Sequence, residues 1–335
     1  MKVRHYFSSA AAIIAVVIAS SAIVAAQRLI TPRPSQNASV SQSVGMADIS
    51  ITYSRPLVKG RTIFAEAPAE MAARASGERT LDNQNDRKAG EPIVPFGHVW
   101  RTGANEATLF TVSDDVLING QPLTAGKYSL HSIPGKDEWT IIFNKDDGQW
   151  GSFTYDESKD ALRVSTKPQW VNSDQEALLF TIEAAAPQDA SEISKLATVN
   201  IRWANVSVPF TVEVRDPNGV ARKRIAAQVA AAKADDWAIP FGAANWAKNS
   251  KDAETAAASK KWFERSLAAI DAQIKTKETF QNLQRRSSSL LALGRKDDAI
   301  AAAERAVVVG KADTTVKPAD ITALEKKIEE LKAGK

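Results

Sequence analysis

The chain has 335 residues, of which 44% are hydrophobic and 24% are charged, and it contains no cysteine. This composition is that of a globular protein of about two domains, and it excludes a disordered chain. The lack of cysteine excludes disulfides, thiolate metal sites, cysteine nucleophiles and the lipid attachment that a bacterial lipoprotein needs.

The N-terminus has the pattern of an export signal. The short basic start MKVRH is followed by the apolar run AAIIAVVIASSAIVAA, which ends in small residues. This pattern predicts a signal peptide over residues 1–26 and a protein exported to the periplasm or the extracellular space. The alternative is an uncleaved anchor in the inner membrane formed by residues 6–27, since no charged side chain lies between His5 and Arg28.

Residues 27–43 are rich in Pro and Ser and are expected to form a linker. Over residues 44–217 apolar side chains alternate with polar ones, as in ADISITY, and Asn119-Gly120 is a strong hairpin signal. Roughly eight to ten short strands of this kind predict an antiparallel β-sandwich. Residues 65–92 lack a strand period and are expected to form an insertion loop with about one helical turn.

The hydrophobic period becomes helical after the turn Asp216–Gly219. Five helix candidates follow, and residues 218–335 are therefore expected to form a small α-helical hairpin domain. Gly294 and Gly310 stand where helices are expected to end, and Ala299 allows two helices to approach closely. The spacing in LLALGRKDDAIAAAERAV is tetratricopeptide-like. The predicted fold class is β plus α.

The two regions differ in charge. Residues 27–217 contain 19 basic and 24 acidic side chains, whereas residues 218–335 contain 22 basic and 15 acidic ones. The basic side chains of the second region are mixed with acidic ones at helical spacing, which indicates solvated helix faces rather than a nucleic-acid surface.

Four stretches, in order, carry a resemblance to a known family: SITYSRPLVKGRTIF, VPFGHVWRTGANEATLFTVSDDVLINGQPLTAGKYSLHSIPGKDEWTIIFNK, QWGSFTYDESKDALRV and the β-rich end near Val214. Over about Ser39–Arg215 the chain resembles the secreted bacterial proteins of domain of unknown function 2911. The resemblance implies a secreted β-rich domain, with C-terminal tetratricopeptide-type helices in many relatives. It implies no established activity and no catalytic residues, and the family is expected to have a shorter link in place of Ala65–Pro92.

The stretch VPFGHVWRTGANEATLF concentrates polar chemistry at one bend between strands. The candidate ligand-binding residues are Trp100, Arg101, Asn105 and Glu106, together with His131 on a following strand. As a ligand clamp, the arginine would bind an anion in a fork and the tryptophan would offer a stacking plane. As a structural bend, Arg101 would pair with Glu106 or a buried carbonyl, and Asn105 would be the exposed member.

The motifs of common enzymes are absent from the sequence. It contains no HExxH, GxSxG, P-loop or GxGxxG motif, and the exported part has only two histidines, His98 and His131. Asp146–Gly148 lacks the spaced carboxylates of a calcium loop and is expected to be a hairpin turn. We therefore expect no metal site, no cofactor and no assignable catalytic residue.

These observations favour an uncharacterised exported envelope protein that acts as a non-enzymatic binding or scaffolding module. Its partner is expected to be a glycan, a peptide or another envelope protein, with no nucleic acid and with membrane contact only through an uncleaved anchor. The alternative is a hydrolase-like enzyme with Glu106 or an aspartate as general base near Arg101. A deep pocket joining Glu106, His131 and a second carboxylate would favour the enzyme, and a filled, ion-paired bend would favour the module.

Overall fold

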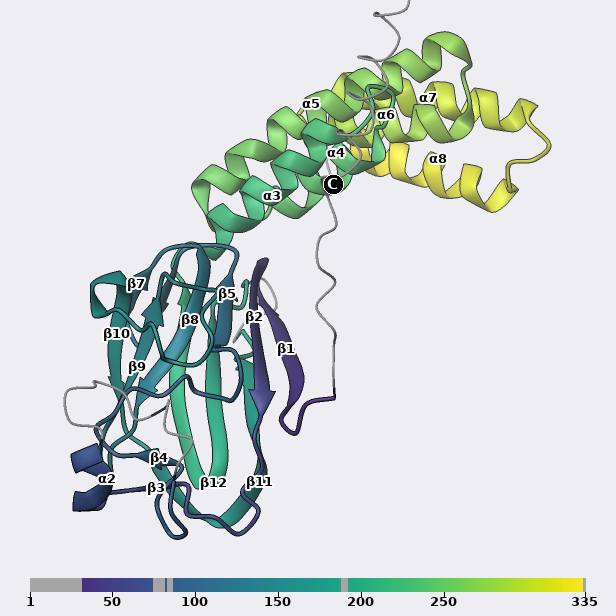
Figure 1. Ribbon diagram of the computed structural model, residues 1–335. Coiled ribbons are helices and arrows are strands. Elements are labelled where there is room, and N and C mark those ends of the chain that lie inside the picture. The colour runs from purple at the N-terminus through teal and green to yellow at the C-terminus, as the bar shows by residue number, and fades with distance from the viewer. Residues whose placement is uncertain (1–31, 75–81, 83–86, 188–191, 334–335) are drawn as a thin grey trace, which may run out of the picture.

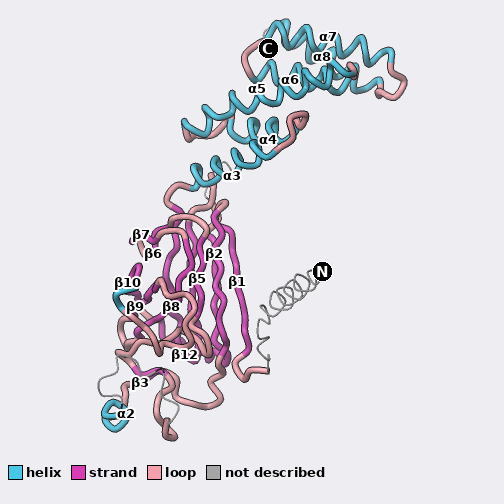
Figure 2. Tube along the Cα trace, turned by 45° about the horizontal axis from the view of Figure 1, so that its top comes forward, coloured by secondary structure: helices cyan, strands magenta, loops and turns pink. Residues whose placement is uncertain are grey.

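The structure is a computed structural model, and it describes residues 32–74, 82, 87–187 and 192–333. Figure 1 shows two regions that follow each other along the chain, a β-sandwich and a layer of helices stacked at one end of it. Figure 2 shows the same helices extending away from that end. The predicted β plus α class, with antiparallel sheets followed by helices, is confirmed.

The larger sheet has six antiparallel strands. In spatial order they are β1 (Gln36–Val44), β2 (Ala47–Arg55), β5 (Thr108–Val112), β8 (Gly126–Ile133), β9 (Trp139–Asn144) and β10 (Asp160–Thr166). Strand β1 pairs with β2 over its whole length, from Gln36 opposite Arg55 to Val44 opposite Ala47. The linker predicted for residues 27–43 is therefore wrong from Gln36 onward. Polar side chains occupy one face of this strand, and Ala38 and Val40 on the other face pack on the core. The many Ser and Gln residues made the alternation too weak to predict a strand from the sequence.

The smaller sheet has four antiparallel strands. Their spatial order is β11 (Gln169–Ala184), β12 (Leu196–Val214), β6 (Val116–Ile118) and β7 (Gln121–Leu123). The hairpin predicted at Asn119-Gly120 is confirmed, because these two residues join β6 to β7 with φ of 46° and 81°. Positive φ at both positions is the backbone of the two-residue turn that matches the twist of paired strands.

The core lies between the two sheets and is dominated by large rings. The fully buried aromatic side chains include Phe110, Trp139, Phe143, Phe180, Trp203 and Phe210. Trp139, Ile141 and Phe143 share the inward face of β9, as their alternation predicts. Burying a Phe or Ile side chain contributes about 1.5–3 kcal/mol, so this cluster accounts for a large share of the stability of the sandwich.

The predicted insertion at residues 65–92 contains α2 (Ala69–Arg74), which lies at the end of the sandwich opposite the C-terminal helices (Figures 1 and 2). The two ends of the insertion are held together by β3 (Phe64–Ala65), which pairs in parallel with β4 (Val94–Pro95). Met71 of α2 is fully buried, so the helix is anchored by an apolar side chain.

The C-terminal region consists of antiparallel helices. They are α3 (Pro217–Ala231), α4 (Ala238–Ala247), α5 (Ala253–Thr276), α6 (Phe280–Ala292), α7 (Lys296–Ala312) and α8 (Pro318–Lys332). Helix α4 is additional to the five candidates. Its Pro240 and Gly242 argue against a helix in a sequence, but Pro240 lies in the first turn, where its missing N–H has no intrahelical partner to lose.

Glycines play two different roles in these helices. Gly294 follows α6 with φ of 76° and ends the helix as predicted. The helix end predicted at Gly310 is wrong, because α7 continues to Ala312. A Cβ at residue 310 would lie 2.7 Å from the ring of Phe280, so the glycine lets α6 and α7 pack closely. The tetratricopeptide-like character of the region stays a prediction.

The sandwich and the helices meet at α3. Asp216 caps this helix by accepting a hydrogen bond from the Gly219 amide at 2.8 Å. Arg224, two turns into α3, binds Asp48 and Asp114 of the sandwich at 3.2 and 2.8 Å. Val220 of α3 also packs against the sandwich core, whereas the apolar clusters of the helices contain no side chain from the sandwich.

The predicted signal peptide lies outside the described residues. In the part of the chain that the structure describes, none of the helices combines the length and the hydropathy that crossing a membrane requires.

Residues 32–217 are expected to fold without the helices, because the sandwich core is made by its own strands and loops and receives from α3 the partly buried Val220 alone. A chain truncated after Pro217 should unfold in urea in one cooperative transition followed alike by tryptophan fluorescence and by circular dichroism. Aggregation, or a broad transition that differs between the two signals, would show that α3 completes the sandwich core.

Candidate functional site

Loops cover the outer face of the six-stranded sheet at the level of β5, β8 and β9. The first loop includes the bend 96–107 and is tied to β8 by the bridge between Trp100 and Ser132. The second loop, residues 145–156, follows β9 and is tied to the bend by the bridge between Glu106 and Trp150. Polar side chains of β8 and β9 therefore lie beneath a second layer of polar side chains.

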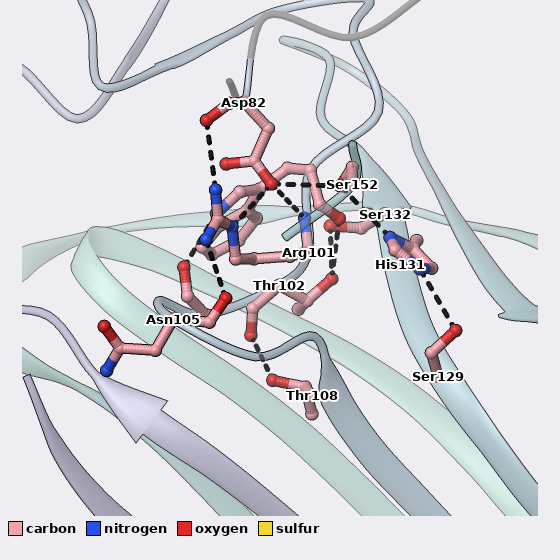
Figure 3. A network of polar contacts seen from close by, with 11 residues as sticks. Asp82, Arg101, Thr102, Asn105, Thr108, Ser129, His131, Ser132 and Ser152 are labelled. Atoms are coloured by element: carbon pink, nitrogen blue, oxygen red, sulfur yellow. Dashed lines mark hydrogen bonds and ion pairs between the residues drawn. The ribbon is translucent and has the colours of Figure 1, made fainter. Parts of the chain in front are cut away.

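Arg101 joins the bend to Asp82 of the insertion (Figure 3). Its Nε donates to Oδ2 of Asp82 at 2.7 Å, one terminal nitrogen donates to the Asp82 carbonyl at 3.0 Å, and the other donates to the Asn105 carbonyl at 2.7 Å. The side chains of Arg101 and Asp82 are only 10% and 8% exposed. The guanidinium is thus buried, paired and directed at the bend itself.

The ion pair of Arg101 with Glu106 that we predicted is wrong, and so is the exposed position of Asn105. Glu106 points to the opposite side of the bend and binds Arg33. The amide nitrogen of Asn105 donates to the Ser35 carbonyl at 3.1 Å and to Ser54 Oγ at 3.2 Å. The physical reason is backbone conformation: Asn105 has φ of 61°, so the strand alternation used for the prediction does not hold there.

Two glycines make room for this arrangement. A Cβ at Gly151 would lie 2.9 Å from the Arg101 guanidinium, and its φ of 66° also favours glycine. A Cβ at Gly103 would lie 2.9 Å from Thr108 Oγ1, whose hydroxyl donates to the Thr102 carbonyl at 2.8 Å.

A chain of hydrogen bonds runs from Asp82 to Gln149 through His131. Ser152 Oγ donates to Asp82 Oδ2 at 2.9 Å and lies 3.2 Å from His131 Nδ1, and Ser129 Oγ lies 3.1 Å from His131 Nε2. The amide nitrogen of Gln149 lies 3.4 Å from Ser129 Oγ.

Donor counting assigns the direction of every bond in this chain. The Asp82 carboxylate can only accept, so the hydroxyl proton of Ser152 is donated to Asp82. Ser152 Oγ can then only accept from His131, and Nδ1 of His131 must therefore carry a proton. Nε2 of the neutral ring then accepts from Ser129, which in turn accepts from Gln149. The histidine is therefore held neutral as the Nδ1–H tautomer.

Burial reinforces the neutral state of His131. The ring is wholly buried, and the cost of placing a charge there lowers its pKa from 6.5 to about 4. The negative charges of Asp82 and Asp160 oppose this shift without cancelling it. His131 is thus a structural hydrogen-bond junction and not a group that titrates near neutral pH.

A neighbouring cluster supports the same layer from β10. Asp160 accepts from the Tyr155 hydroxyl at 2.7 Å, from Arg163 Nε at 2.6 Å and from the Asn144 amide at 2.7 Å. The Tyr155 ring lies 5.1 Å from the His131 ring. Burial and the bond to Asp160 raise the pKa of the Tyr155 hydroxyl above its usual value.

A pocket of ≈ 640 Å³ opens beside this polar layer, on the other side of the bend. It is bounded by the start of the described chain, by β1 and β2, by the bend and by the turn after β9. Its lining residues are Pro32, Arg33, Gln36, Asn37, Thr52, Tyr53, Ser54, Glu106, Ala107, Leu109, Asp147, Gly148 and Gln149. Among the predicted ligand-binding residues only Glu106 lies in this lining.

Gln149 belongs both to the pocket lining and to the hydrogen-bond chain. The residue is 6% exposed, and its Oε1 is buried without a hydrogen-bond partner in the described structure. Its amide nitrogen is held only by long contacts, 3.3 Å to the Asp146 carbonyl and 3.4 Å to Ser129 Oγ. Turning the amide over would face its oxygen toward a carbonyl, so the unpartnered atom is an acceptor.

The other predicted residues have structural positions. Trp100 is buried in the core, where its ring stacks on Trp203 at 5.6 Å and its Nε1 donates to the Gly103 carbonyl at 3.1 Å. His131 lies beneath the loops and not in the pocket. Asp82, Arg33 and Gln149 were not predicted from the sequence, because no periodicity or motif relates them to a bend that is distant from them in the chain.

Among the described residues, no three His, Asp or Glu side chains converge in a way that would hold a metal ion.

Residues 82–212 match the model of a family described as "Protein of unknown function (DUF2911)". This span runs from Asp82, the partner of Arg101, to β12, so it includes the bend, both loops and most of the sandwich. No curated protein and no solved structure matches the chain. The resemblance noted in the sequence is thereby confirmed. The family is one of unknown function, so the match assigns no activity to the chain.

Replacing Arg101 with Met should destabilise the protein by about 3–5 kcal/mol, because it removes one member of a buried ion pair and the hydrogen bonds that Arg101 donates to Asp82 and to the Asn105 carbonyl. A double-mutant cycle with Asp82→Asn, measured by urea unfolding, should give a coupling energy of about 1–3 kcal/mol. The same cycle between Arg101→Met and Glu106→Gln should give nearly zero. Coupling of Arg101 to Glu106 instead of Asp82 would contradict the assignment.

Stability should also fall between pH 6.5 and pH 4 through His131. The unfolded chain binds a proton near pH 6.5 and the folded chain only near pH 4, so the neutral ring stabilises the fold above this window and that contribution is lost as the pH falls through it. The slope should be about 1.4 kcal/mol per pH unit. His131→Gln should remove the part of the pH dependence of stability that His131 contributes. The part that His98 contributes should be the same in the wild type and in the variant. An unchanged slope would show that His131 is not the titrating group.

Proposed function

We propose that this chain, which belongs through residues 82–212 to the DUF2911 family of proteins of unknown function, is an exported binding module of the bacterial envelope. Its ligand occupies the pocket between the bend and the turn after β9. The expected ligand is a glycan, a peptide or a segment of another envelope protein. Export is supported by the signal pattern at residues 1–26.

The unpartnered Oε1 of Gln149 carries this proposal. Buried polar atoms are nearly always hydrogen-bonded, since leaving one unpaired costs about 1–3 kcal/mol. An exception in a pocket wall is explained when a ligand supplies the missing donor. The terminal torsion of glutamine is broad, so the amide can turn toward a ligand at little cost.

The dimensions of the pocket agree with this role. Its volume of ≈ 640 Å³ falls within the range of roughly 300–1,000 Å³ that is usual for ligand pockets. Its wall combines apolar atoms of Pro32, Tyr53 and Leu109 with the amides of Asn37 and Gln149. A few polar groups on an apolar wall are what orients a bound molecule.

The hydrolase-like alternative receives less support from the geometry. Arg101 donates to Asp82 and Asn105 and is not available to stabilise charge on a substrate. Ser129 lies against His131 as a nucleophile lies against its base, yet both side chains are buried beneath the loops. The ion-paired bend is the arrangement that favours a binding module.

Gln149→Met tests the proposal, because methionine preserves the length of the side chain and removes the acceptor. Panels of glycans and peptides are screened by thermal shift, since a ligand that binds only the folded state raises the melting temperature. Any ligand found should bind the variant about tenfold more weakly, the effect of one lost buried hydrogen bond. The variant itself should lose less than about 1 kcal/mol of stability, because the contacts of its amide are long.

Gln175→Met is the matched control, since Gln175 lies in β11 and bonds only to the Ala177 carbonyl at 3.0 Å. It should leave ligand affinity unchanged. A ligand that binds wild type and Gln149→Met equally would place the binding site elsewhere.

A further inference from the structure

Strand β1 forms one edge of the six-stranded sheet (Figures 1 and 2). Among the described strands it pairs only with β2, to which it is joined by a two-residue turn with Gly45 at φ of 60°. The residues that flank such a turn form a hydrogen-bonded pair, and bonded and non-bonded pairs then alternate along the strands. The residues whose backbone N–H and C=O groups point away from β2 are therefore Asn37, Ser39, Ser41 and Ser43.

The other long edges of the two sheets are protected against strand addition. Proteins protect an exposed sheet edge by short strands, prolines, bulges and charged side chains. Strand β7 has three residues and contains Pro122, β10 has a register shift and carries Arg163, and β11 has two register shifts and the exposed Glu183. Strand β1 has none of these features, because its nine residues are uncharged, contain no proline and pair with β2 without a register shift.

The sequence of β1 is complementary to itself. Antiparallel pairing of two copies centred on Val40 sets Ser39 opposite Ser41 of the second copy and Asn37 opposite Ser43 of the second copy. In this register all the outward backbone groups of both strands meet in hydrogen-bonded pairs. The facing side chains are small, uncharged and exposed, so they meet without repulsion and can hydrogen-bond across the strands. A two-fold interface requires this kind of self-complementarity.

We propose that two copies of the chain associate through β1, antiparallel and in register about Val40, so that their six-stranded sheets become one continuous sheet. The inference goes beyond the binding function proposed for the pocket and does not depend on it. The helices lie at the Val44 end of β1, where Arg224 of α3 binds Asp48. Antiparallel pairing therefore places the helices of the two copies at opposite ends of the joint sheet.

The test is the mass of residues 27–335 by sedimentation equilibrium, without the preceding apolar run, which would associate by itself. The wild type should be a dimer. The double variant Ser39→Lys with Ser41→Lys should associate at least about tenfold more weakly, because like charges directly opposite each other are destabilising. The double variant with glutamate at the same two positions should be weakened alike. An equimolar mixture of the two variants should restore the dimer, since opposite charges then face each other.

Disulfide cross-linking tests the register. The chain contains no cysteine, so Val40→Cys introduces its one thiol. In the proposed register residue 40 faces its own copy in a non-hydrogen-bonded pair, whose Cα atoms lie about 4.5 Å apart, within the span of a disulfide. Oxidation should therefore link two copies of Val40→Cys.

Ser165 of β10 is the matched control, because it is an exposed serine on the opposite edge of the same sheet. Ser165→Lys should leave the dimer intact, and Ser165→Cys should not cross-link. Circular dichroism should show that all variants are folded. A monomeric wild type, a dimer that the double lysine variant leaves unchanged, or a mixture of lysine and glutamate variants that stays monomeric would each overturn the inference.

Discussion

The buried guanidinium of Arg101 is the constraint on which the outer layer of the sandwich depends. A charge that is withdrawn from water must find a counter-ion and an acceptor for its donors, or its burial costs several kcal/mol. Arg101 meets this requirement with Asp82 and with the carbonyl of Asn105, which come from the insertion and from the bend. The turn at Asn105 and the glycine at position 151 follow from it, because the carbonyl must face the guanidinium and the loop must leave it space.

The same constraint separates two kinds of polar group that are adjacent in space. Groups on one side of the bend are saturated: the donors and acceptors from Asp82 to His131 form one directed chain. On the other side, Gln149 leaves an acceptor unpaired among the described residues. A network in which every hydrogen-bonding group has a partner makes a structure rigid. An acceptor without a partner in a pocket wall can instead accept a hydrogen bond from a ligand. The bend therefore separates the hydrogen-bonded network around Arg101 from the pocket.

The helices add a region with its own cores at the far end of the sandwich. Their link to it combines the ion pairs of Arg224, the capped start of α3 and one apolar contact, that of Val220 with the sandwich core. The pocket is formed by the sandwich and by the segment before β1, and no helix from α3 onward contributes to its lining. The binding proposed for this pocket would therefore involve the sandwich and the segment before it rather than the helices.

Much of the fold could be predicted from the sequence because local patterns report local geometry. Alternation placed Trp139, Ile141 and Phe143 on one inward face, and Asn119-Gly120 identified a two-residue hairpin, since both depend only on neighbouring residues. The bend at Arg101 was also recognisable as a concentration of polar chemistry. Its partners were not: Asp82 and Arg33 reach the bend only through the folded chain, and Glu106 and Asn105 changed roles because positive φ interrupted the alternation. Composition and periodicity thus determined the class of fold and the position of the polar bend. The ion-pair partners of that bend were decided by tertiary structure. The physical reason is that charges pair according to their distance in space and their burial, and not according to their separation in the sequence.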